Sequence, residues 1–301
     1  MVSAIVTTYK REPDMVLRAI DSILMQTYKD IELIVVDDSP DEFELRNDVK
    51  NAVLDRAKQS RDIEIRYIAH EKNMGACVAR NTGLNSSRGE YVAYLDDDDE
   101  WMPEKIEKQV EVIQKSNVAL VGCGSISVND TDGTKKVRNV TPHRGKVFKE
   151  LLSINFIGST SFPLIRKSSL IDVDGFDPLM QSVQDYDVWL RIAEKYEIEY
   201  IDEPLVIYHE HNDGRITTNP QKRINGTTRL CQKFQTYLDA DRRLWWEKHR
   251  ELSRQYALNG EYGKAVKNWW KCVCKCPEKI KYNSAFFYII IQAARNQTKN
   301  K

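Results

Sequence analysis

The first hundred residues alternate between short apolar runs and amphipathic stretches. We expect strands at residues 3–9, 31–37, 63–69 and 90–96. The run IELIVVD at residues 31–37 is mostly apolar, which is typical of a strand buried on both faces. Helical spacing after Pro13, a charged stretch at residues 42–59 and a further segment starting near Gly75 predict the intervening helices. This order predicts parallel strands with right-handed crossovers and helices on both faces.

The pattern is less regular after residue 103. We expect helices at residues 103–116, 146–152 and 185–196, and strands at residues 118–128, 198–202 and 205–209, with a turn at 129–133. From residue 221 onward the pattern is almost entirely helical. The sequence therefore predicts an α/β domain over residues 1–220 and a helical C-terminal extension over residues 221–301, whose motif Ala257, Gly260, Tyr262, Ala265 is typical of one helix hairpin.

Polar residues gather where the predicted strands end. Ligands of parallel sheets bind beyond the carboxyl ends of the strands. Thr8 and Tyr9 end the first strand, the two aspartates of VVDDSP end the second, and the segment YLDDDDEW ends the fourth. We therefore expect the chemistry at one edge of the sheet.

The acidic segment YLDDDDEW is the strongest of these features. Four consecutive carboxylates repel one another unless a cation or solvent compensates them. Mg²⁺ and Mn²⁺ prefer oxygen ligands, and Asp96 and Asp98 alternate so that both face one side. Asp99 or Glu100, shortly before Pro103, could instead cap the following helix. We assign the cap to one of those two residues and metal binding to Asp98.

Three other polar sites allow two interpretations each. Asp38 could accept a hydrogen bond from a nucleotide base or ribose, although an Asx turn explains VVDDSP equally well. Asp185, in SVQDYDVWLRIA, is either a helix cap or a general base. His209, His211 and Arg215 lie on a polar loop that suits a diphosphate or a metal ion, or else simply faces solvent.

Composition and charge narrow the classes of protein. The 45 Lys and Arg residues balance the 45 Asp and Glu residues, but residues 241–301 hold 14 basic and 5 acidic residues. That basic end is a solvated helical face or a surface for nucleic acid or an anionic membrane. No leader pattern opens the chain, which predicts a cytoplasmic protein, and the apolar run at residues 285–291 is too short to span a membrane.

The cysteines and the missing motifs exclude further classes. Cys272, Cys274 and Cys276 lack zinc spacing, and on a helix the first and third share a face while Cys274 points away, so we expect buried free thiols there. The chain has no G-x-G-x-x-G after its first strand and no G-x-x-x-x-G-K-[ST]. Dinucleotide dehydrogenases are therefore disfavoured and P-loop ATPases excluded.

Four ordered motifs carry a resemblance to a known family. These are IVTTYKREPDMVLRAIDSILMQTYKDIELIVVDDSP, NMGACVARNTGLNSSRGEYVAYLDDDDEW, GSTSFPLIRKSSLIDVDGFDP and QDYDVWLRIA. Together they resemble the family 2 glycosyltransferases of GT-A fold, over residues 2 to about 220. The resemblance implies a Rossmann-like mixed sheet flanked by helices, with residues 1–117 binding the nucleotide-sugar and residues 118–220 binding the acceptor.

The same resemblance implies an activity and assigns roles. It implies an inverting, hexosyltransferase-type enzyme that uses a nucleotide-diphospho-sugar, most simply a UDP-sugar, and Mn²⁺ or Mg²⁺. By position, donor contacts fall to Thr7, Tyr9, Asp38, Arg80, Asn81, Asp96, Asp97 and His211. The resemblance assigns metal binding to Asp98, Asp96 and His211, and the role of catalytic base to Asp185. Gln184 stands where the family commonly has glutamate, and His209 where arginine is frequent.

Three functions remain in competition. The first is a transferase that builds a polysaccharide, glycan or glycolipid on a glycan or lipid-linked acceptor. The second is a non-catalytic module that binds a nucleotide-sugar or glycan. The third, a phosphotransferase, would need an aspartate nucleophile at the end of the first strand, where the chain has Thr7, Thr8 and Tyr9. The basic aromatic tail, with Trp245, Trp246, Trp269, Trp270 and residues 286–291, predicts peripheral contact with the inner face of a membrane and no nucleic-acid partner.

Overall fold

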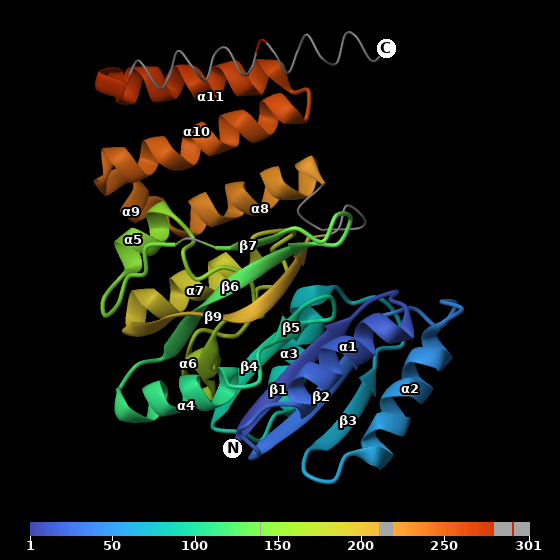
Figure 1. Ribbon diagram of the computed structural model, residues 1–301. Coiled ribbons are helices and arrows are strands. Elements are labelled where there is room, and N and C mark those ends of the chain that lie inside the picture. The colour runs from blue at the N-terminus through green and yellow to red at the C-terminus, as the bar shows by residue number, and fades with distance from the viewer. Residues whose placement is uncertain (139, 211–218, 280–290, 292–301) are drawn as a thin grey trace. The chain divides into compact units, whose positions relative to one another are not determined.

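The computed structural model describes residues 1–138, 140–210, 219–279 and 291 (Figure 1). The chain forms two compact units. The first comprises Met1–Pro178 and Asp185–His211, and the second comprises Leu179–Gln184 and Asn212–Lys301. The boundary predicted at residue 220 thus lies inside the second unit, which also takes in a short segment that precedes it in the chain.

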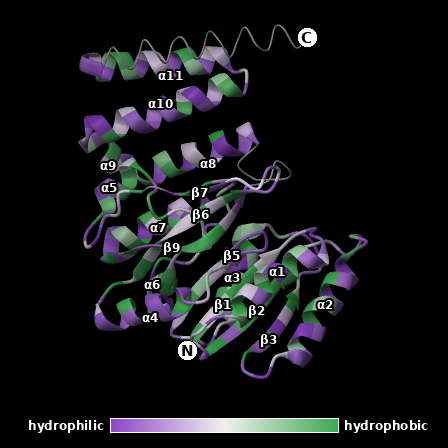
Figure 2. Cartoon of the chain, in the orientation of Figure 1, coloured by the Kyte–Doolittle hydropathy of each residue, from purple (hydrophilic) through white to green (hydrophobic). Residues whose placement is uncertain are grey.

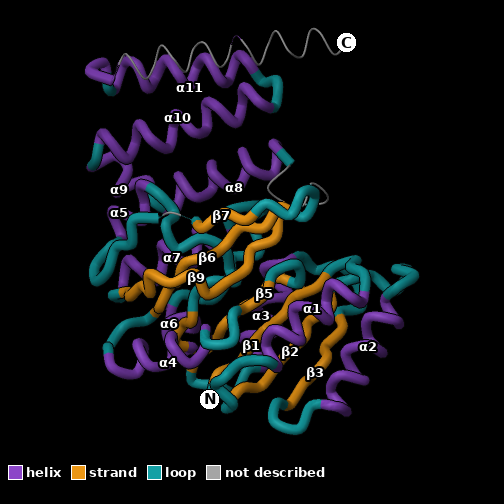
Figure 3. Tube along the Cα trace, viewed as in Figure 1, coloured by secondary structure: helices purple, strands orange, loops and turns teal. Residues whose placement is uncertain are grey.

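A mixed β-sheet forms the centre of the first unit (Figure 3). Its strands lie in the order β3-β2-β1-β4-β8-β6-β9-β5, and β7 pairs with β6. They are β1 (Val2–Thr8), β2 (Ile31–Asp37), β3 (Glu64–Ala69), β4 (Tyr91–Asp96), β5 (Glu100–Trp101), β6 (Leu120–Asn129), β7 (Lys135–Val137), β8 (Leu164–Arg166) and β9 (Ile198–Glu210). The first four strands are parallel, as predicted, and β8 is antiparallel to both of its neighbours.

Helices cover both faces of the parallel strands. The helices of this unit are α1 (Pro13–Leu24), α2 (Arg46–Gln59), α3 (Ala76–Ser86), α4 (Lys105–Lys115), α5 (Phe148–Ser153), α6 (Lys167–Asp172) and α7 (Gln184–Lys195). Alternate β1 residues such as Val6 join one core with α1, α2 and α4. The next residue, Ile5, faces α3, where a Cβ on Gly83 would lie only 2.4 Å from Ile5 Cγ2. Gly83 therefore lets α3 approach β1 closely.

The long strand β9 replaces two predicted strands. Residues 198–202 and 205–209 belong to one strand that runs parallel to β6. The pairing register shifts around Gly124, which lies opposite Pro204. A Cβ on Gly124 would come within 2.8 Å of the Glu203 carbonyl oxygen. Pro204, between the two predicted strands, thus lies at a β-bulge, and Gly124 provides the space for it.

The two short strands β5 and β8 were not predicted from the sequence. They contain two and three residues, too few for any periodicity to be recognised. Both are held by tertiary pairing, since Trp101 lies opposite Val206 of β9 and Leu164 opposite Ala93 of β4. These two strands attach the less regular half of the unit to the parallel half.

The second unit is helical, as predicted. It contains α8 (Pro220–Lys233), α9 (Gln235–Ala240), α10 (Arg242–Leu258), α11 (Tyr262–Lys275) and the short 3₁₀ helix η2 (Pro277–Lys279). Figure 2 shows hydrophobic and hydrophilic residues interspersed along α10 and α11, which is typical of helices with one buried side. Ser182, from the segment before α7, lies against α8, where a Cβ on Gly226 would come within 2.6 Å of the Ser182 carbonyl oxygen.

The predicted hairpin motif joins α10 to α11. Ala257 and Ala265 are both buried there and pack with Tyr262. Gly260 has a φ of +79°, the left-handed conformation that glycine adopts most easily at the end of a helix. The two small residues let the helices approach, and the glycine reverses the chain.

All six cysteines lie in described parts of the chain and all are free. Cys272 and Cys276 are buried whereas Cys274 is exposed, which confirms the predicted helical faces. Burial raises the pKa of the Cys272 thiol to about 12. The segment is therefore a set of inert core thiols with one exposed member.

Among the residues that the structure describes, none of the helices combines the length and the apolar character needed to cross a bilayer. Residues 286–290 of the predicted apolar tail lie outside the described parts of the chain.

Candidate active site

The carboxyl ends of β1, β2 and β4 meet at one edge of the sheet. Thr7 pairs with Asp96, and Thr8 pairs with Asp37. This register confirms that the polar strand ends lie side by side. The candidate site therefore lies within the first unit, at the end of its parallel strands.

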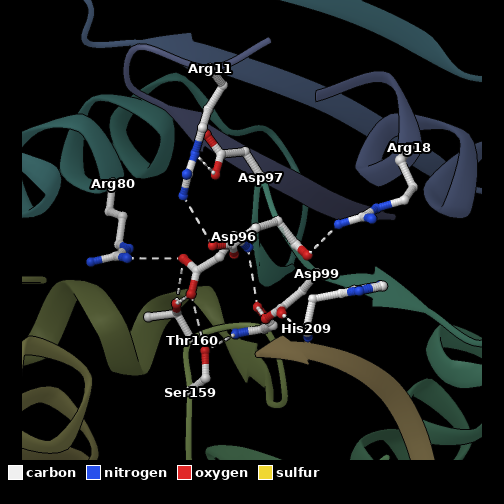
Figure 4. A network of polar contacts seen from close by, with 11 residues as sticks. Arg11, Arg18, Arg80, Asp96, Asp97, Asp99, Ser159, Thr160 and His209 are labelled. Carbon is white, nitrogen blue, oxygen red and sulfur yellow. Dashed lines mark hydrogen bonds and ion pairs between the residues drawn. The ribbon is translucent and has the colours of Figure 1, made fainter. Parts of the chain in front are cut away.

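Asp96 is held by three side chains from two other segments (Figure 4). Arg80 Nη2 on α3 donates to Oδ1 at 3.0 Å. The hydroxyls of Thr160 and Ser159 donate to the same carboxylate at 2.9–3.0 Å. Burial alone would raise the pKa of Asp96, but Arg80 and these hydroxyls bring it below its usual value. Asp96 is therefore held as an anion.

Arg11, just beyond the end of β1, connects the next two carboxylates. Its Nε donates to Asp97 Oδ1 and its Nη2 to Asp98 Oδ2, both at 3.0 Å. Burial raises the pKa of Asp97 to about 6, with Arg11 opposing the shift and Asp98 adding to it. One guanidinium thus spans two adjacent carboxylates, using the fork of donors that arginine provides.

Asp99 does not cap a helix. It is fully buried, accepts a hydrogen bond from Ser161 Oγ at 2.6 Å, and accepts another from the His209 backbone N–H at 3.2 Å. Glu100 lies in β5, and the residue before α4 is Glu104. The predicted cap is therefore wrong, because tertiary partners that the local sequence cannot reveal take both oxygens of Asp99. Burial, with the charges of Asp96 and Asp98, raises its pKa well above the usual value.

The cluster suits a hard divalent cation. The side chains of Asp96 and Asp98 are 27% and 16% exposed, whereas that of Asp97 is 6% exposed. Asp97 is thus the most buried of the three, with its Oδ2 buried, and the shared orientation of Asp96 and Asp98 stays a prediction. Burial is the main reason that the pKa values of Asp97 and Asp99 are raised, and the charges of neighbouring aspartates add to both shifts.

The described residues contain no set of three or more His, Cys, Asp or Glu side chains that could hold a metal ion. Mg²⁺ commonly takes one or two protein carboxylates and completes its shell with water and substrate phosphates. Two reachable carboxylates fit that pattern. His211, the third predicted ligand, lies outside the described residues.

Asp185 lies in the first turn of α7 and is half-buried. Its Oδ1 accepts a 2.7 Å hydrogen bond from the Tyr186 backbone N–H. Burial raises the pKa of Asp185 to about 6, although that N–H and Arg80 act in the opposite direction. Asp96 also contributes to the rise, which shows that the two carboxylates share one electrostatic environment.

Asp38 organises the loop that leads into α3. Its oxygens accept hydrogen bonds from the backbone N–H groups of Met74 and Gly75 at 2.7 and 2.8 Å, and Oδ1 lies 2.7 Å from His70 Nδ1. Its neighbour Asp37 forms the predicted Asx turn by accepting from the Ser39 N–H at 2.8 Å. The base-binding role of Asp38 stays a prediction, while its positioning role is visible.

The other predicted donor residues occupy different surroundings. Thr7 is half-buried at the strand edge, and Tyr9 is 43% exposed. Asn81 exchanges two hydrogen bonds with the backbone of Phe176, at 2.7 and 2.8 Å, and thereby attaches α3 to the loop before α7. Its contact with the donor, like those of Thr7 and Tyr9, stays a prediction.

His209 lies beside the acidic segment. Its Nε2 is 2.8 Å from Glu100 Oε1, and its Nδ1 is 2.7 Å from Asp130 Oδ1. The histidine that replaces a frequent arginine in the resembling family therefore joins β5, β9 and the β6–β7 turn. His209 thus links Glu100 at the end of the acidic segment to Asp130.

Several residues that hold the carboxylates in place were not predicted from the sequence. These are Arg11, Arg18, Ser159, Thr160 and Ser161; Arg18 Nη2 donates to the Asp98 carbonyl oxygen at 2.8 Å. The signal available was the position of Lys10 and Arg11 directly after a strand, and the polar run GSTS. Neither indicates a partner, because the contacts join residues more than 60 positions apart.

Known proteins resemble this chain in sequence. Residues 3–174 match the family profile described as Glycosyl transferase family 2. A putative colanic acid biosynthesis glycosyl transferase of Escherichia coli is 27% identical over 272 residues, covering 82% of this chain and 90% of that protein. A putative teichuronic acid biosynthesis glycosyltransferase of Bacillus subtilis is 29% identical over 229 residues, covering 75% and 85%.

A solved structure shares the fold. The crystal structure of Staphylococcus aureus TarS 1–349 in complex with UDP-GlcNAc superposes with a TM-score of 0.65 at 15% identity, covering 98% of this chain and 89% of that chain. This likeness confirms the predicted fold class, a GT-A mixed sheet flanked by helices with a helical extension. The family profile covers more than half of the sequence, and the chain belongs to glycosyl transferase family 2.

Proposed function

We propose that this protein transfers a sugar from a UDP-sugar to an acceptor hydroxyl during polysaccharide synthesis, with inversion at the anomeric carbon. Family membership supports the transfer reaction. The complexes of TarS with UDP-GlcNAc and with UDP support a UDP-sugar donor. The two bacterial relatives named for the biosynthesis of an acid support a polysaccharide product.

One observation carries the proposal, the opposite behaviour of two carboxyl groups in one electrostatic environment. The pKa of Asp96 is lowered and that of Asp185 is raised to about 6. Environments that separate the pKa values of neighbouring acids are typical of sites that assign them different roles. Asp96 suits permanent charge, whereas Asp185 suits proton transfer near neutral pH.

In the proposed reaction, Asp185 removes the proton from the acceptor hydroxyl as that oxygen attacks the anomeric carbon. The bond from this carbon to the nucleoside diphosphate breaks on the opposite face, so a single displacement inverts the configuration. Asp98 and Asp96, with His211, would hold Mn²⁺ or Mg²⁺, which stabilises the negative charge on the departing diphosphate. Arg11 and Arg80 keep the carboxylates in place.

The donor contacts follow the strand edge. We assign the nucleotide to Thr7, Tyr9 and Asp38, and the diphosphate side to Arg80 and Asn81. Asp97 acts through Arg11 and does not contact the donor, because its side chain is buried. This assignment narrows the expectation from the sequence, which placed Asp97 at the donor.

The test is a panel of UDP-, GDP- and dTDP-sugars assayed with and without Mn²⁺. We expect Mn²⁺-dependent binding of a UDP-sugar and its consumption when an acceptor is supplied. The Asp98→Ala variant should lose the metal-dependent part of donor affinity, whereas Asp55→Ala, a matched exposed aspartate, should keep it. Binding without consumption of any donor would favour the non-catalytic module.

For the second unit we propose contact with an anionic membrane that carries a lipid-linked acceptor. Val266, Trp270 and Cys274 are spaced four residues apart on α11, and all three are exposed. Lys267 and Lys271 are exposed beside them. A tryptophan flanked by lysines is typical of interfacial helices.

Sedimentation with vesicles tests this contact. The full chain should pellet with phosphatidylglycerol vesicles at low salt and stay in solution with phosphatidylcholine vesicles. Lys267→Glu together with Lys271→Glu should abolish pelleting, and Lys50→Glu together with Lys58→Glu on α2 is the control that makes the same change of net charge. Retention of the unchanged protein in the supernatant at low salt overturns the contact.

A further inference from the structure

Arg138, immediately after β7, stands apart from the other arginines around the candidate site. Arg11, Arg80 and Arg191 each form an ion pair with an aspartate at 2.7–3.0 Å. Arg138 has no carboxylate partner among the residues that the structure describes. Its guanidinium donates to two backbone carbonyl oxygens, those of Ile157 and Asn155, both at 3.2 Å.

The fold makes room for this side chain. The Arg138 guanidinium stacks over Phe162, with Cζ 5.4 Å from the ring centroid. Gly158 has a φ of +98°, and a Cβ there would lie 2.4 Å from Arg138 Nη1. A larger residue at 158 would therefore push the guanidinium away. Burial lowers the pKa of Arg138, opposite to the direction for Arg11 and Arg80, because the charges of Tyr200, Tyr208 and Asp185 offset the loss of water only in part.

The loop that holds Arg138 also holds the site. Ile157 and Asn155 accept from Arg138, Gly158 O accepts a 3.1 Å hydrogen bond from Trp189 Nε1 on α7, and Ser159 donates to Asp96. Two residues of chain span at most about 7 Å, so the carbonyl anchoring Arg138 lies close to the Asp96 contact. Asp185 is among the groups whose charges act on Arg138.

Arg138 lies opposite Ser125 across the β6–β7 strand pair. Its backbone N–H donates to Ser125 O at 2.9 Å, continuing the register in which Val137 lies opposite Ile126. Side chains directly opposite in an antiparallel pair share a face. The Ser125 side chain is fully buried, and its Oγ has no hydrogen-bond partner. Buried hydroxyls are normally satisfied, so Ser125 Oγ is an unsatisfied polar atom on the face that Arg138 shares.

Each arginine has five N–H donors in a planar fork, and the backbone carbonyls accept from two of the Arg138 nitrogens. Paired donors of this kind match a carboxylate. Arg138 is half-buried, so a ligand can reach it from solvent. A neutral sugar hydroxyl would leave the charge of the guanidinium uncompensated in a partly desolvated position.

We propose that Arg138 binds the carboxylate of a uronic acid, so that the sugar handled at this site is anionic. The proposal rests on the proposed transferase function and adds the class of sugar to it. The carboxylate belongs either to the donor sugar or to the sugar at the end of the acceptor. In both cases Arg138 determines specificity and takes no part in bond breaking.

The experiment compares matched ligands that differ only at one carbon. The donor arm measures binding of UDP-glucuronic acid and UDP-glucose with Mn²⁺. The acceptor arm measures binding of methyl glucuronide and methyl glucoside to the protein saturated with UDP and Mn²⁺. We expect the unchanged protein to prefer the carboxylate by tenfold or more in one of the two arms, which also identifies its source.

Substitutions then assign the preference to Arg138. Arg138→Met should abolish this preference, and the ratio of the two affinities is the readout, because loss of the contacts to Asn155 and Ile157 would lower both affinities alike. Arg138→Lys, which keeps the charge but loses the fork, should retain about a threefold preference and serves if the methionine variant does not fold. Arg144→Met is the control, since Arg144 pairs with Asp202 and is 42% exposed.

Two outcomes separate this inference from the proposed function. If UDP binds but neither arm shows a carboxylate preference, or if the preference survives Arg138→Met, the uronic acid inference is wrong and the transferase function stands. If UDP does not bind the unchanged protein with Mn²⁺, the proposed function fails and the inference fails with it.

Discussion

Asp96 at the end of β4 and Asp185 at the start of α7 have pKa values that are shifted in opposite directions. At the end of β4, arginine, threonine and serine side chains from three segments surround Asp96 and Asp98. At the start of α7, the hydrogen bond to the Asp185 carboxylate comes from a backbone N–H of its own helix. The surroundings of Asp96 stabilise its negative charge, whereas those of Asp185 disfavour a negative charge there.

In the proposed mechanism this difference separates metal binding, assigned to Asp96, from proton transfer, assigned to Asp185. A carboxylate that must remain charged receives cations and hydroxyl donors from elements distant in the chain. Asp185, the proposed base, is half-buried, and its pKa is raised to about 6. Substitutions at Asp185, or at the residues that hold Asp96, should change one of these two environments and leave the other intact.

Replacing Asp185 by Asn removes the group that exchanges the proton and keeps its shape. General-base assistance is worth about 10²–10⁴ in rate, so kcat should fall by that factor while UDP-sugar binding stays unchanged. Steady-state kinetics and titration calorimetry on the same preparation measure both. Transfer near the rate of the unchanged protein would remove Asp185 from the mechanism.

Replacing Arg80 by Met removes the cation that holds Asp96. Breaking a buried ion pair from one side leaves a partly buried charge, and we expect a loss of about 3 kcal/mol of unfolding free energy at pH 7. The lowered pKa of Asp96 contributes stability above its unfolded pKa and loses it as pH falls. Urea unfolding should therefore show a smaller difference at pH 3.5.

The control for Arg80→Met is Lys58→Met, which breaks the exposed pair between Lys58 and Asp55. Exposed pairs contribute less than about 1 kcal/mol, so this change should alter the unfolding free energy little at either pH. Equal losses in the two variants would mean that the burial of Asp96 has no energetic consequence.

The raised pKa of Asp185 predicts the pH dependence of transfer. A base acts when deprotonated, so kcat/KM should be level above pH 7 and fall about tenfold per unit below about pH 6. Asp97 also has a pKa raised to about 6, so the Asp97→Asn variant is the control and should keep the midpoint. A level profile down to pH 4.5 would contradict the raised pKa of Asp185.

Replacing Thr160 by Val removes one hydroxyl donor to Asp96 and keeps the side-chain shape. A hydrogen bond to a charged group contributes about 1.5–3 kcal/mol, and since Ser159 and Arg80 remain we expect the lower end of that range. Thermal unfolding measures it, with Thr134→Val on the exposed β6–β7 turn as the control. A loss as large as that of Arg80→Met would mean that the hydroxyls, and not the cation, hold Asp96.

The parallel half of the fold was predictable because its signals are local. The mostly apolar run at Ile31–Asp37 and the polar ends of β1 and β4 determine strand position and direction, and the register then brings Thr7 beside Asp96. The strand β8 and the segment Ser159–Ser161 were not predictable. Their positions depend on partners distant in the chain, and a three-residue strand has no periodicity to read.

The same distinction explains the error at Asp99. An aspartate before a helix with proline is a reasonable cap when only the local sequence is known. Its actual partners are Ser161 and the backbone of His209, 62 and 110 residues away. The carboxylates of the site were thus predictable, and the groups that hold them were not.

The arrangement of the thiols on α11 has a practical consequence. Five of the six cysteines are buried, and Cys274 is exposed on the same face as Trp270. A maleimide dye should therefore attach to the unmutated protein at this one position. Its fluorescence would report directly whether that helix face enters a lipid headgroup layer.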